Sequence, residues 1–216
     1  MRGDGRVVAV AGATGLVGGE LVKQLAAEPG VAEVRALVRR PFDFGLPKVR
    51  VCRVDYAAPE SWRGLLRVDQ VYSALGTPIR MTTAEARVRE VDHDHTIQVA
   101  RLARQEGARH FLTVSTLQAD VASKILFCRI KGEAEATIAA LGFPSLTIAR
   151  PSFLWGQRSE FRAPERIGGA LAFLMPPLWR TIHGSRVARA LILAAEKEKP
   201  GIEILENRAL LRMTAS

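Results

Sequence analysis

The sequence predicts one α/β domain in which a doubly wound parallel sheet carries helices on both faces. Short apolar runs alternate with helical patterns along the chain, and this alternation requires crossover helices that cover the two faces of a parallel sheet. A glycine-rich turn follows the first apolar run, at residues 12–18. The 216 residues contain no repeat or linker-like stretch, so we expect one domain over residues 1–216.

Seven apolar or alternating runs predict the strands. Runs such as "VVAVA" are apolar throughout, which is typical of buried parallel strands, whereas "KVRVCRVD" alternates. In chain order, the predicted strands are residues 7–11, 31–38, 48–55, 70–75, 110–116, 145–151 and 202–206.

Apolar residues at helical spacing predict the helices between these strands. Glycine and proline mark several of their ends, because neither residue continues a helix well. The predicted helices begin at residue 16 and stop at Pro29, form a short turn at 61–66, and then cover 83–106, 125–141, 166–174 and 185–195.

The glycine-rich turn is the strongest functional signal. Gly12, Gly15 and Gly18 form G-x-x-G-x-x-G between the first strand and the first helix. In dinucleotide-binding folds, such glycines permit a tight turn, let the backbone approach a pyrophosphate and let the helix pack against the strand. The helix N-terminus then presents free N–H groups to the anion. The alternative is a turn that needs glycine only for packing, and the strand–turn–helix context favours the dinucleotide.

The end of the second strand bears on which dinucleotide binds. An acidic residue there would hold a ribose 2′-hydroxyl and favour NAD(H), but Arg39 and Arg40 occupy this place. Guanidinium groups suit a 2′-phosphate, so the sequence favours NADP(H) over NAD(H). The alternative is a pair of solvated loop arginines. Asp55 ends the third strand and is expected near the adenine, or as a turn-forming residue.

Composition and charge narrow the partners. The net charge of +9 comes from 31 basic and 22 acidic residues, but the arginines are scattered and no nucleic-acid-binding motif accompanies them. The longest apolar run, 168–179, is too short to span a membrane. Cys52 and Cys128 lack metal-type spacing, and His93 and His95 face different directions on a helix, so no metal site is expected. The cysteine usage, with no signal segment after "MRGDGR", predicts a reducing, cytoplasmic setting.

The chain resembles the atypical short-chain dehydrogenases, and among them the NAD(P)H-binding oxidoreductases related to the Tat-interacting protein. The likeness runs from about Val7 to Leu210, and its longest shared segment lies between residues 91 and 116. The segments that carry it are "GATGLVG", "LVRR", "RVDY", "ALGT", "VDHDHTIQVARLARQEGARHFLTVST", "IKGEAE", "ARPSFLWG" and "EILENRAL".

This resemblance implies a Rossmann-type fold with NADP(H) across the strand ends. The phosphate cradle would be formed by Gly12, Thr14, Gly15, Leu16, Val17 and Gly18. The arginine pair would meet the adenosine phosphate, and Asp55 would meet the adenine. Ala74, Leu75, Gly76 and Thr77 would line the ribose, while Pro151 and Phe153 would close over the nicotinamide. Ser115 would lie beside the nicotinamide as a catalytic residue, and Lys131 would bind its ribose hydroxyls.

One departure from the family bears on activity. Active members carry a tyrosine four residues before the lysine, and its phenol protonates the product alkoxide; Phe127 stands there instead. Neither Tyr56 nor Tyr72 has a lysine four residues later. Without the acid, we expect acceptors such as quinones, whose delocalised product needs no protein proton donor. Lys131 could instead be an exposed helix lysine paired with Glu135, and the Ser115 hydroxyl could bond its own backbone.

Three classes of function remain open at this point. The first is an NADP(H)-dependent reductase of conjugated acceptors, and the second is a catalytically silent NADP(H)-binding sensor or regulator. The third is a nucleic-acid-associated protein, which the glycine loop disfavours. The substrate side is expected mainly in residues 151–184, where "GGALAFLMPPLW" would be a substrate lid, a packed helix end or a self-association surface.

Overall fold

The computed structural model describes residues 5–77, 84–156 and 180–215. Seven strands form one sheet in the order β3-β2-β1-β4-β5-β6-β9, and every neighbouring pair is parallel. The strands are β1 Arg6–Ala11, β2 Val31–Val38, β3 Val49–Arg53, β4 Gln70–Ser73, β5 His110–Val114, β6 Ser145–Arg150 and β9 Gly201–Glu206. The predicted fold class, a doubly wound parallel sheet, is therefore confirmed.

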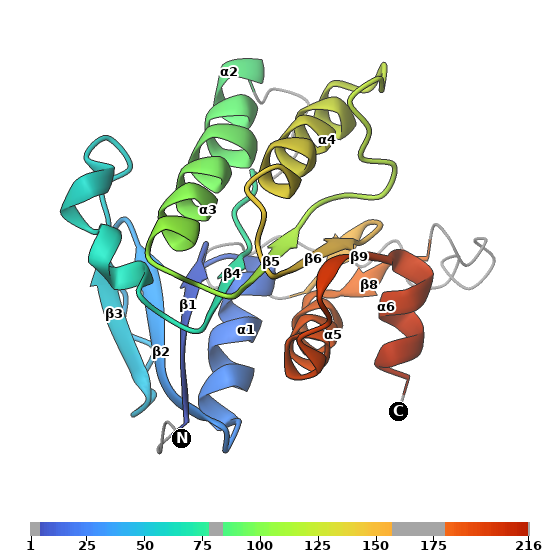
Figure 1. Cartoon of the computed structure of the whole chain (residues 1–216). Coiled ribbons are helices and arrows are strands. Elements are labelled where there is room, and N and C mark those ends of the chain that lie inside the picture. Colours follow the sequence, from blue (N-terminus) through green and yellow to red (C-terminus); the bar gives the residue numbers. More distant parts are fainter. Residues whose placement is uncertain (1–4, 78–83, 157–179, 216) are drawn as a thin grey trace.

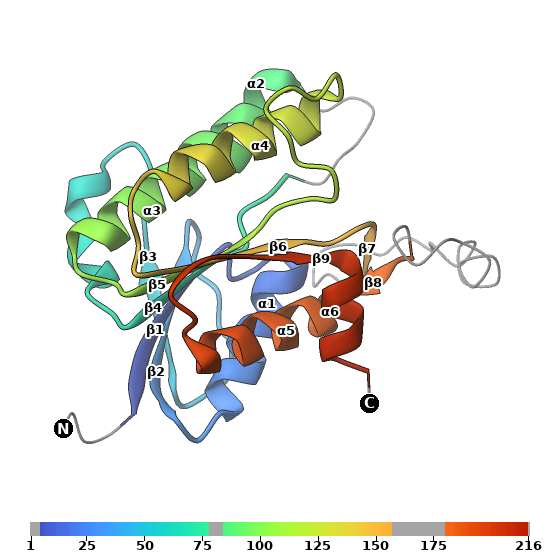
Figure 2. The same ribbon diagram turned by 45° about the vertical axis from the view of Figure 1, so that its right-hand side comes forward.

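Helices cover both faces of this sheet (Figures 1 and 2). One face carries α2, α3 and α4, and the other carries α1, α5 and α6. Their bounds are α1 Leu16–Ala27, α2 Glu85–Val88, α3 Thr96–Gln105, α4 Leu126–Ala139, α5 Gly184–Lys197 and α6 Asn207–Met213. Short 3₁₀ turns at Pro59–Ser61 and Arg63–Leu66 connect β3 to β4.

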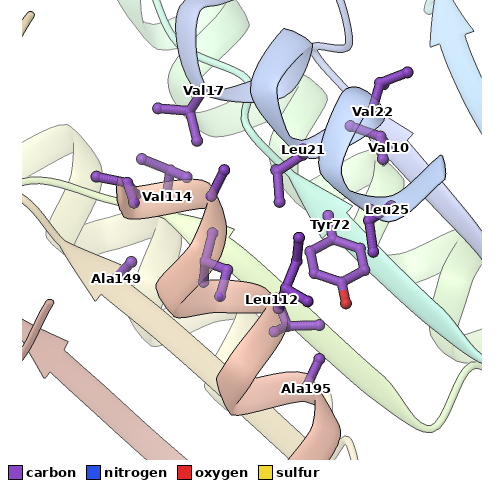
Figure 3. Close-up of a cluster of buried hydrophobic side chains, with 14 of the residues drawn as sticks. Val10, Val17, Leu21, Val22, Leu25, Tyr72, Leu112, Val114, Ala149 and Ala195 are labelled. Carbon is purple, nitrogen blue, oxygen red and sulfur yellow. The ribbon is translucent and has the colours of Figure 1, made fainter. Parts of the chain in front are cut away.

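Each face of the sheet has its own apolar core. Figure 3 shows one of them, in which Leu21 and Leu25 of α1 point toward Tyr72 of β4 and Leu112 of β5. The second core lies under α3 and α4 and contains Phe111, which stacks on Phe143 with ring centroids 5.1 Å apart. Burial on both faces explains why most of these strands read as continuous apolar runs.

The long helix expected at 83–106 is interrupted. A π-helical segment, Arg89–His95, separates α2 from α3, and it is called the π segment below. The apolar residues on either side of the π segment keep their helical spacing, so the sequence pattern does not reveal the segment. Such segments occur often at functional sites.

Three further elements were not predicted. Strands β7 Leu154–Trp155 and β8 Ile182–His183 form a separate two-stranded sheet. Helix α6 begins directly after β9, with no turn residue between the two. The helix expected at 166–174 and the lid-like stretch 168–179 lie outside the described residues, as does most of the expected substrate side.

Candidate functional site

The candidate site lies where the sheet changes direction, between β1 and β4. The chain leaves these neighbouring strands for opposite sides, so their carboxyl ends flank a crevice. Gly12 follows β1 with a φ of +75°, and a β-carbon there would stand 2.5 Å from the carbonyl oxygen of Ala74, just after β4. Only glycine fits this close approach of the two loops.

The other two loop glycines have different roles. A β-carbon at Gly18 would stand 2.0 Å from the carbonyl oxygen of Gly12, so Gly18 is needed for packing α1 against the loop. Gly15 has an ordinary φ of −79°, and a β-carbon there would meet Gly12 O at 3.1 Å and Ala74 O only at 3.9 Å. The packing alternative thus accounts for Gly12 and Gly18, whereas a β-carbon at Gly15 would be close only to Gly12 O, and a glycine there suits backbone approach by an anionic ligand.

A cleft of about 530 Å³ opens on the β2–β3 side of this loop. Its lining residues come from the ends of β2 and β3 and from the π segment. They are Arg39, Arg53, Val54, Asp55, Tyr56, Ala57, Glu90 and His95. The cleft therefore combines cationic, acidic and aromatic groups beside the carboxyl ends of the strands.

Only one of the two predicted arginines lines the cleft. Arg39 lines the cleft, and none of the ion pairs among the described residues involves it. Arg40 is exposed but does not line the cleft. Asp55 also lines it, and Oδ1 accepts a 2.9 Å hydrogen bond from the Ala57 amide, so the alternative turn role is confirmed, while the contact with adenine stays a prediction. Arg39 is thus placed to meet an anion without breaking an ion pair to any of the described residues.

Two stacked rings form part of the cleft wall. Tyr56 and His95 lie nearly parallel with centroids 4.1 Å apart, and Trp62 packs edge-on against Tyr56. Burial raises the pKa of Tyr56 to about 12. Burial also lowers the pKa of His95; Glu90 offsets part of this shift, and Arg39 adds to it. His95 is therefore neutral at pH 7. It is a cleft residue and was not predicted as one from the sequence.

Lys131 is buried and not exposed. Only 5% of the residue is accessible, and Nζ donates hydrogen bonds of 3.2 Å to the carbonyl oxygens of Leu75 and Val114. Nζ also lies 2.9 Å from Oδ1 of Asp92. The alternative of a surface lysine paired with Glu135 is wrong, because Glu135 forms an ion pair with Arg150 at 2.6 Å.

Two hydroxyl groups near this lysine lack partners. Ser115 follows β5 and is 7% exposed; among the described residues, neither its Oγ nor Oγ1 of Thr77 has a hydrogen-bond partner. The expectation that the Ser115 hydroxyl bonds its own backbone is therefore wrong. Buried hydroxyls usually have partners, so these two, at the ends of β5 and β4, fit a polar ligand at the crevice.

The remaining predicted residues differ in exposure. Thr14 is exposed and Leu16 is half-buried, whereas the Val17 side chain belongs to the core shown in Figure 3. Pro151 is buried, and Phe153 is 62% exposed. Val17 can therefore offer a ligand only its backbone.

Phe127 and Gly76 complete the predicted set. Phe127 is half-buried on α4, one helical turn before Lys131. Gly76 is exposed after β4, and a β-carbon there would stand 3.3 Å from Oδ1 of Asp92. The ends of β4, β5 and α4 thus converge on one buried polar cluster.

Asp92 is the principal residue that was not predicted. It is fully buried on the π segment, and Oδ2 accepts a 2.9 Å hydrogen bond from the Thr77 amide. A signal was present: Asp92 lies four residues after the inward-facing Val88, and a carboxylate on a buried helix face requires a partner. Lys131 is that partner.

Comparison with known proteins agrees with this geometry. A family described as NAD(P)H-binding matches residues 12–160. The chain is 32% identical to the mitochondrial protein FMP52 of Coccidioides immitis, over 90% of this chain and 87% of that protein. It is 29% identical to the protein HTATIP2 of Rattus norvegicus, over 95% of this chain and 88% of that protein. These matches confirm the resemblance drawn from the sequence motifs.

Solved structures share the fold. MoeE5 in complex with UDP-glucuronic acid and NAD has a TM-score of 0.70 at 21% identity, over 94% of this chain and 75% of that one. UDP-glucuronic acid 4-epimerase from Bacillus cereus, in complex with NAD, has a TM-score of 0.69 at 16% identity, over 94% and 78%. At this identity, the likeness concerns the fold alone.

The predicted cytoplasmic location is contradicted. Relatives from Coccidioides immitis, Emericella nidulans and Candida albicans are named as mitochondrial proteins. Cys52 and Cys128 are free and buried, which suits any reducing compartment and so does not separate the two locations. Within the described ranges, no helix is long and apolar enough to cross a membrane, and no His, Cys, Asp and Glu cluster suits a metal ion.

Proposed function

The chain belongs to the NAD(P)H-binding family, and on this premise we propose that it binds NADP(H) and reduces quinone-like or conjugated carbonyl acceptors. The proposal treats residues 1–216 as one domain, with the substrate side mainly in residues 151–184. The observation that carries it is the loop from Gly12 to Gly18, which meets the carboxyl end of β4 directly before the N-terminus of α1. Bound there, a reduced nicotinamide would supply hydride.

The two ends of the crevice would take different parts of the cofactor. Arg39, Asp55 and the stacked pair of Tyr56 and His95 line the cleft, which suits the adenosine end. The pyrophosphate would meet the amides of residues 12–18 at the N-terminus of α1. The ribose and nicotinamide would lie between residues 74–77 and 115, with the backbone of 151–153 beside them.

The preference for NADP(H) rests on the charge of the cleft. Arg39 has no ion-pair partner among the described residues, and an unpaired guanidinium favours a 2′-phosphate. The acids of the cleft are already engaged. Glu90 pairs with Arg87 at 2.7 Å, and Asp55 accepts from the backbone. The backbone hydrogen bond leaves the charge of Asp55 in place, so the attraction to phosphate would come from Arg39 and Arg53, the two arginines of the cleft.

Phe127 determines the class of acceptor. A simple ketone becomes a basic alkoxide on reduction, and losing the acid that protonates it costs about a hundredfold to ten-thousandfold in rate. A quinone or enone gives a delocalised oxyanion that water can protonate. Ser115 Oγ is buried and has no hydrogen-bond partner among the residues that the structure describes, so it could donate a hydrogen bond to the acceptor oxygen, but not the phenolic proton that Phe127 lacks.

A second function is favoured by a specific observation. Lys131 is buried and paired, and Phe127 has no proton to give, which suits a catalytically silent NADP(H)-binding regulator. NADPH oxidation across a panel of quinones, enones and aldehydes distinguishes the two. If the protein is a reductase, we expect turnover with quinones and enones and almost none with simple aldehydes. NADPH binding without oxidation by any acceptor would overturn the reductase in favour of the regulator.

A further inference from the structure

Lys131 joins three elements at the crevice. Two of its hydrogen bonds reach the carbonyl oxygens of Leu75 after β4 and Val114 at the end of β5. The third side of the ammonium faces Asp92 on the π segment, 2.9 Å from Oδ1. An ammonium has three hydrogens. Two carbonyl oxygens and the Asp92 carboxylate therefore surround the ammonium, and its contact with Asp92 is an ion pair.

Asp92 connects the same lysine to the loop after β4. Its second oxygen, Oδ2, accepts the amide hydrogen of Thr77 at 2.9 Å. The carboxylate is fully buried, and the lysine side chain is only 6% exposed. A side chain at Gly76 would press on this pair, since its β-carbon would stand 3.3 Å from Oδ1 and 4.0 Å from Nζ.

We propose that Asp92 is a positioning residue that neutralises Lys131 and fixes the loop at residues 75–77. At 2.9 Å, the negative charge opposes the ammonium's field at the groups around the pair, and position 127 lies one helical turn before Lys131 on α4. Lys131 then acts as a buried cross-link. This inference refines the site of the proposed function, but its main test needs no bound cofactor.

The other charges around the pair do not undo this cancellation. The ends of β4 and β5 contribute only carbonyl oxygens to Lys131. On α4, Glu135 is held by Arg150. Between the π segment and α4, Arg89 pairs with Glu133 at 2.8 Å. Each of these neighbouring charges is thus paired with an opposite one.

Neutralisation of Lys131 changes the expected effect of Phe127→Tyr. A nearby positive charge lowers a phenol's pKa, but a lysine with its charge cancelled has little effect. The single change therefore supplies a phenol without activating it. Asp92→Asn removes the opposing charge and keeps an oxygen that can accept from Thr77. An activated phenol requires both changes.

Spectrophotometric titration of the introduced phenol tests this directly. The native phenols stay protonated below about pH 11, because burial raises the pKa of Tyr56 to about 12 and that of Tyr72 further. We expect the phenol in Phe127→Tyr to titrate near or above its ordinary value of about 10. Adding Asp92→Asn should lower that pKa by roughly one unit or more. The matched control, Asp94→Asn, removes an exposed carboxylate two residues away and should leave the pKa unchanged.

A charge-free replacement guards against loss of folding. Asp92→Asn combined with Lys131→Met removes both charges of the pair, and in the Phe127→Tyr background the pKa should match that of Phe127→Tyr alone. The proposal would be overturned if this replacement raised the pKa of the introduced phenol. It would also be overturned if the phenol of Phe127→Tyr alone titrated well below 10. NADPH binding by the same proteins is measured separately. A protein that fails to bind NADPH but shows the expected titrations refutes the proposed function and leaves the role of Asp92 standing.

Discussion

Replacing Arg39 should change which nucleotide the protein prefers. Arg39 lines the cleft and is unpaired within the described residues, whereas Arg40, the next residue, does not line it. Arg39→Ala should therefore weaken NADPH binding and leave NADH binding nearly unchanged. Arg40→Ala is the matched control, because it removes the same charge one position away.

The magnitude follows from the exposure of Arg39. Two unit charges about 4 Å apart interact by about 4 kcal/mol at an effective dielectric constant near 20. Arg39 is exposed, and solvent screening reduces such attractions strongly. We therefore expect a loss of about 1–2 kcal/mol, which is roughly a fivefold to thirtyfold weaker affinity for NADPH. Arg40→Ala should cost less than about 0.5 kcal/mol.

Isothermal titration calorimetry with NADPH and NADH measures this difference. The unmodified protein, Arg39→Ala and Arg40→Ala are compared at one ionic strength, since salt screens the attraction. Equal losses for NADPH and NADH in Arg39→Ala would refute the reasoning, because the arginine would then not be reading the 2′-phosphate. Equal losses in the two variants would refute the assignment to Arg39.

Three further predictions concern stability. Lys131→Met should lower the free energy of unfolding by about 3–5 kcal/mol, because Asp92 is left buried without an opposite charge. Adding Asp92→Asn should recover part of the lost stability, and denaturant titrations measure both effects. Gly18→Ala should destabilise the fold or displace the loop, because its β-carbon would stand 2.0 Å from Gly12 O, and thermal unfolding measures this. Burial lowers the pKa of His110 to about 4, whereas its ordinary value in an unfolded chain is about 6.5. Between these two values the unfolded chain binds more protons than the folded one, so stability should fall as the pH drops below about 6.5. The loss should reach about 3 kcal/mol near pH 4, and His110→Gln should flatten it; an unchanged acid dependence in that variant would contradict the assignment.

Much of the fold follows from local patterns. Strand β2 has the predicted bounds, and α1 begins at Leu16 and ends before Pro29 as expected. These elements are specified by apolar spacing and by glycine or proline at their ends. The π segment, β7 and β8 depend on contacts between distant parts of the chain, so no local pattern reveals them.

The candidate site was predictable in part. The glycine loop stands out because its spacing and its strand–turn–helix context are local features. Asp92 and His95 could not be placed from spacing alone, because their roles come from Lys131 and Tyr56, 39 residues away in each direction. The missing tyrosine at Phe127 is visible in the sequence, but the cancelled charge of Lys131 is visible only in the structure.

Binding of a nicotinamide dinucleotide at the glycine loop underlies the proposed function. NADPH affinity measured by calorimetry for Gly15→Val tests it most directly. Gly64→Val is the control, since a β-carbon at that exposed glycine meets nothing within 4 Å. We expect Gly15→Val to stay folded by circular dichroism and to bind NADPH at least roughly tenfold more weakly, because a branched side chain blocks the pyrophosphate. Folded Gly15→Val that binds NADPH as tightly as the unmodified protein would contradict it.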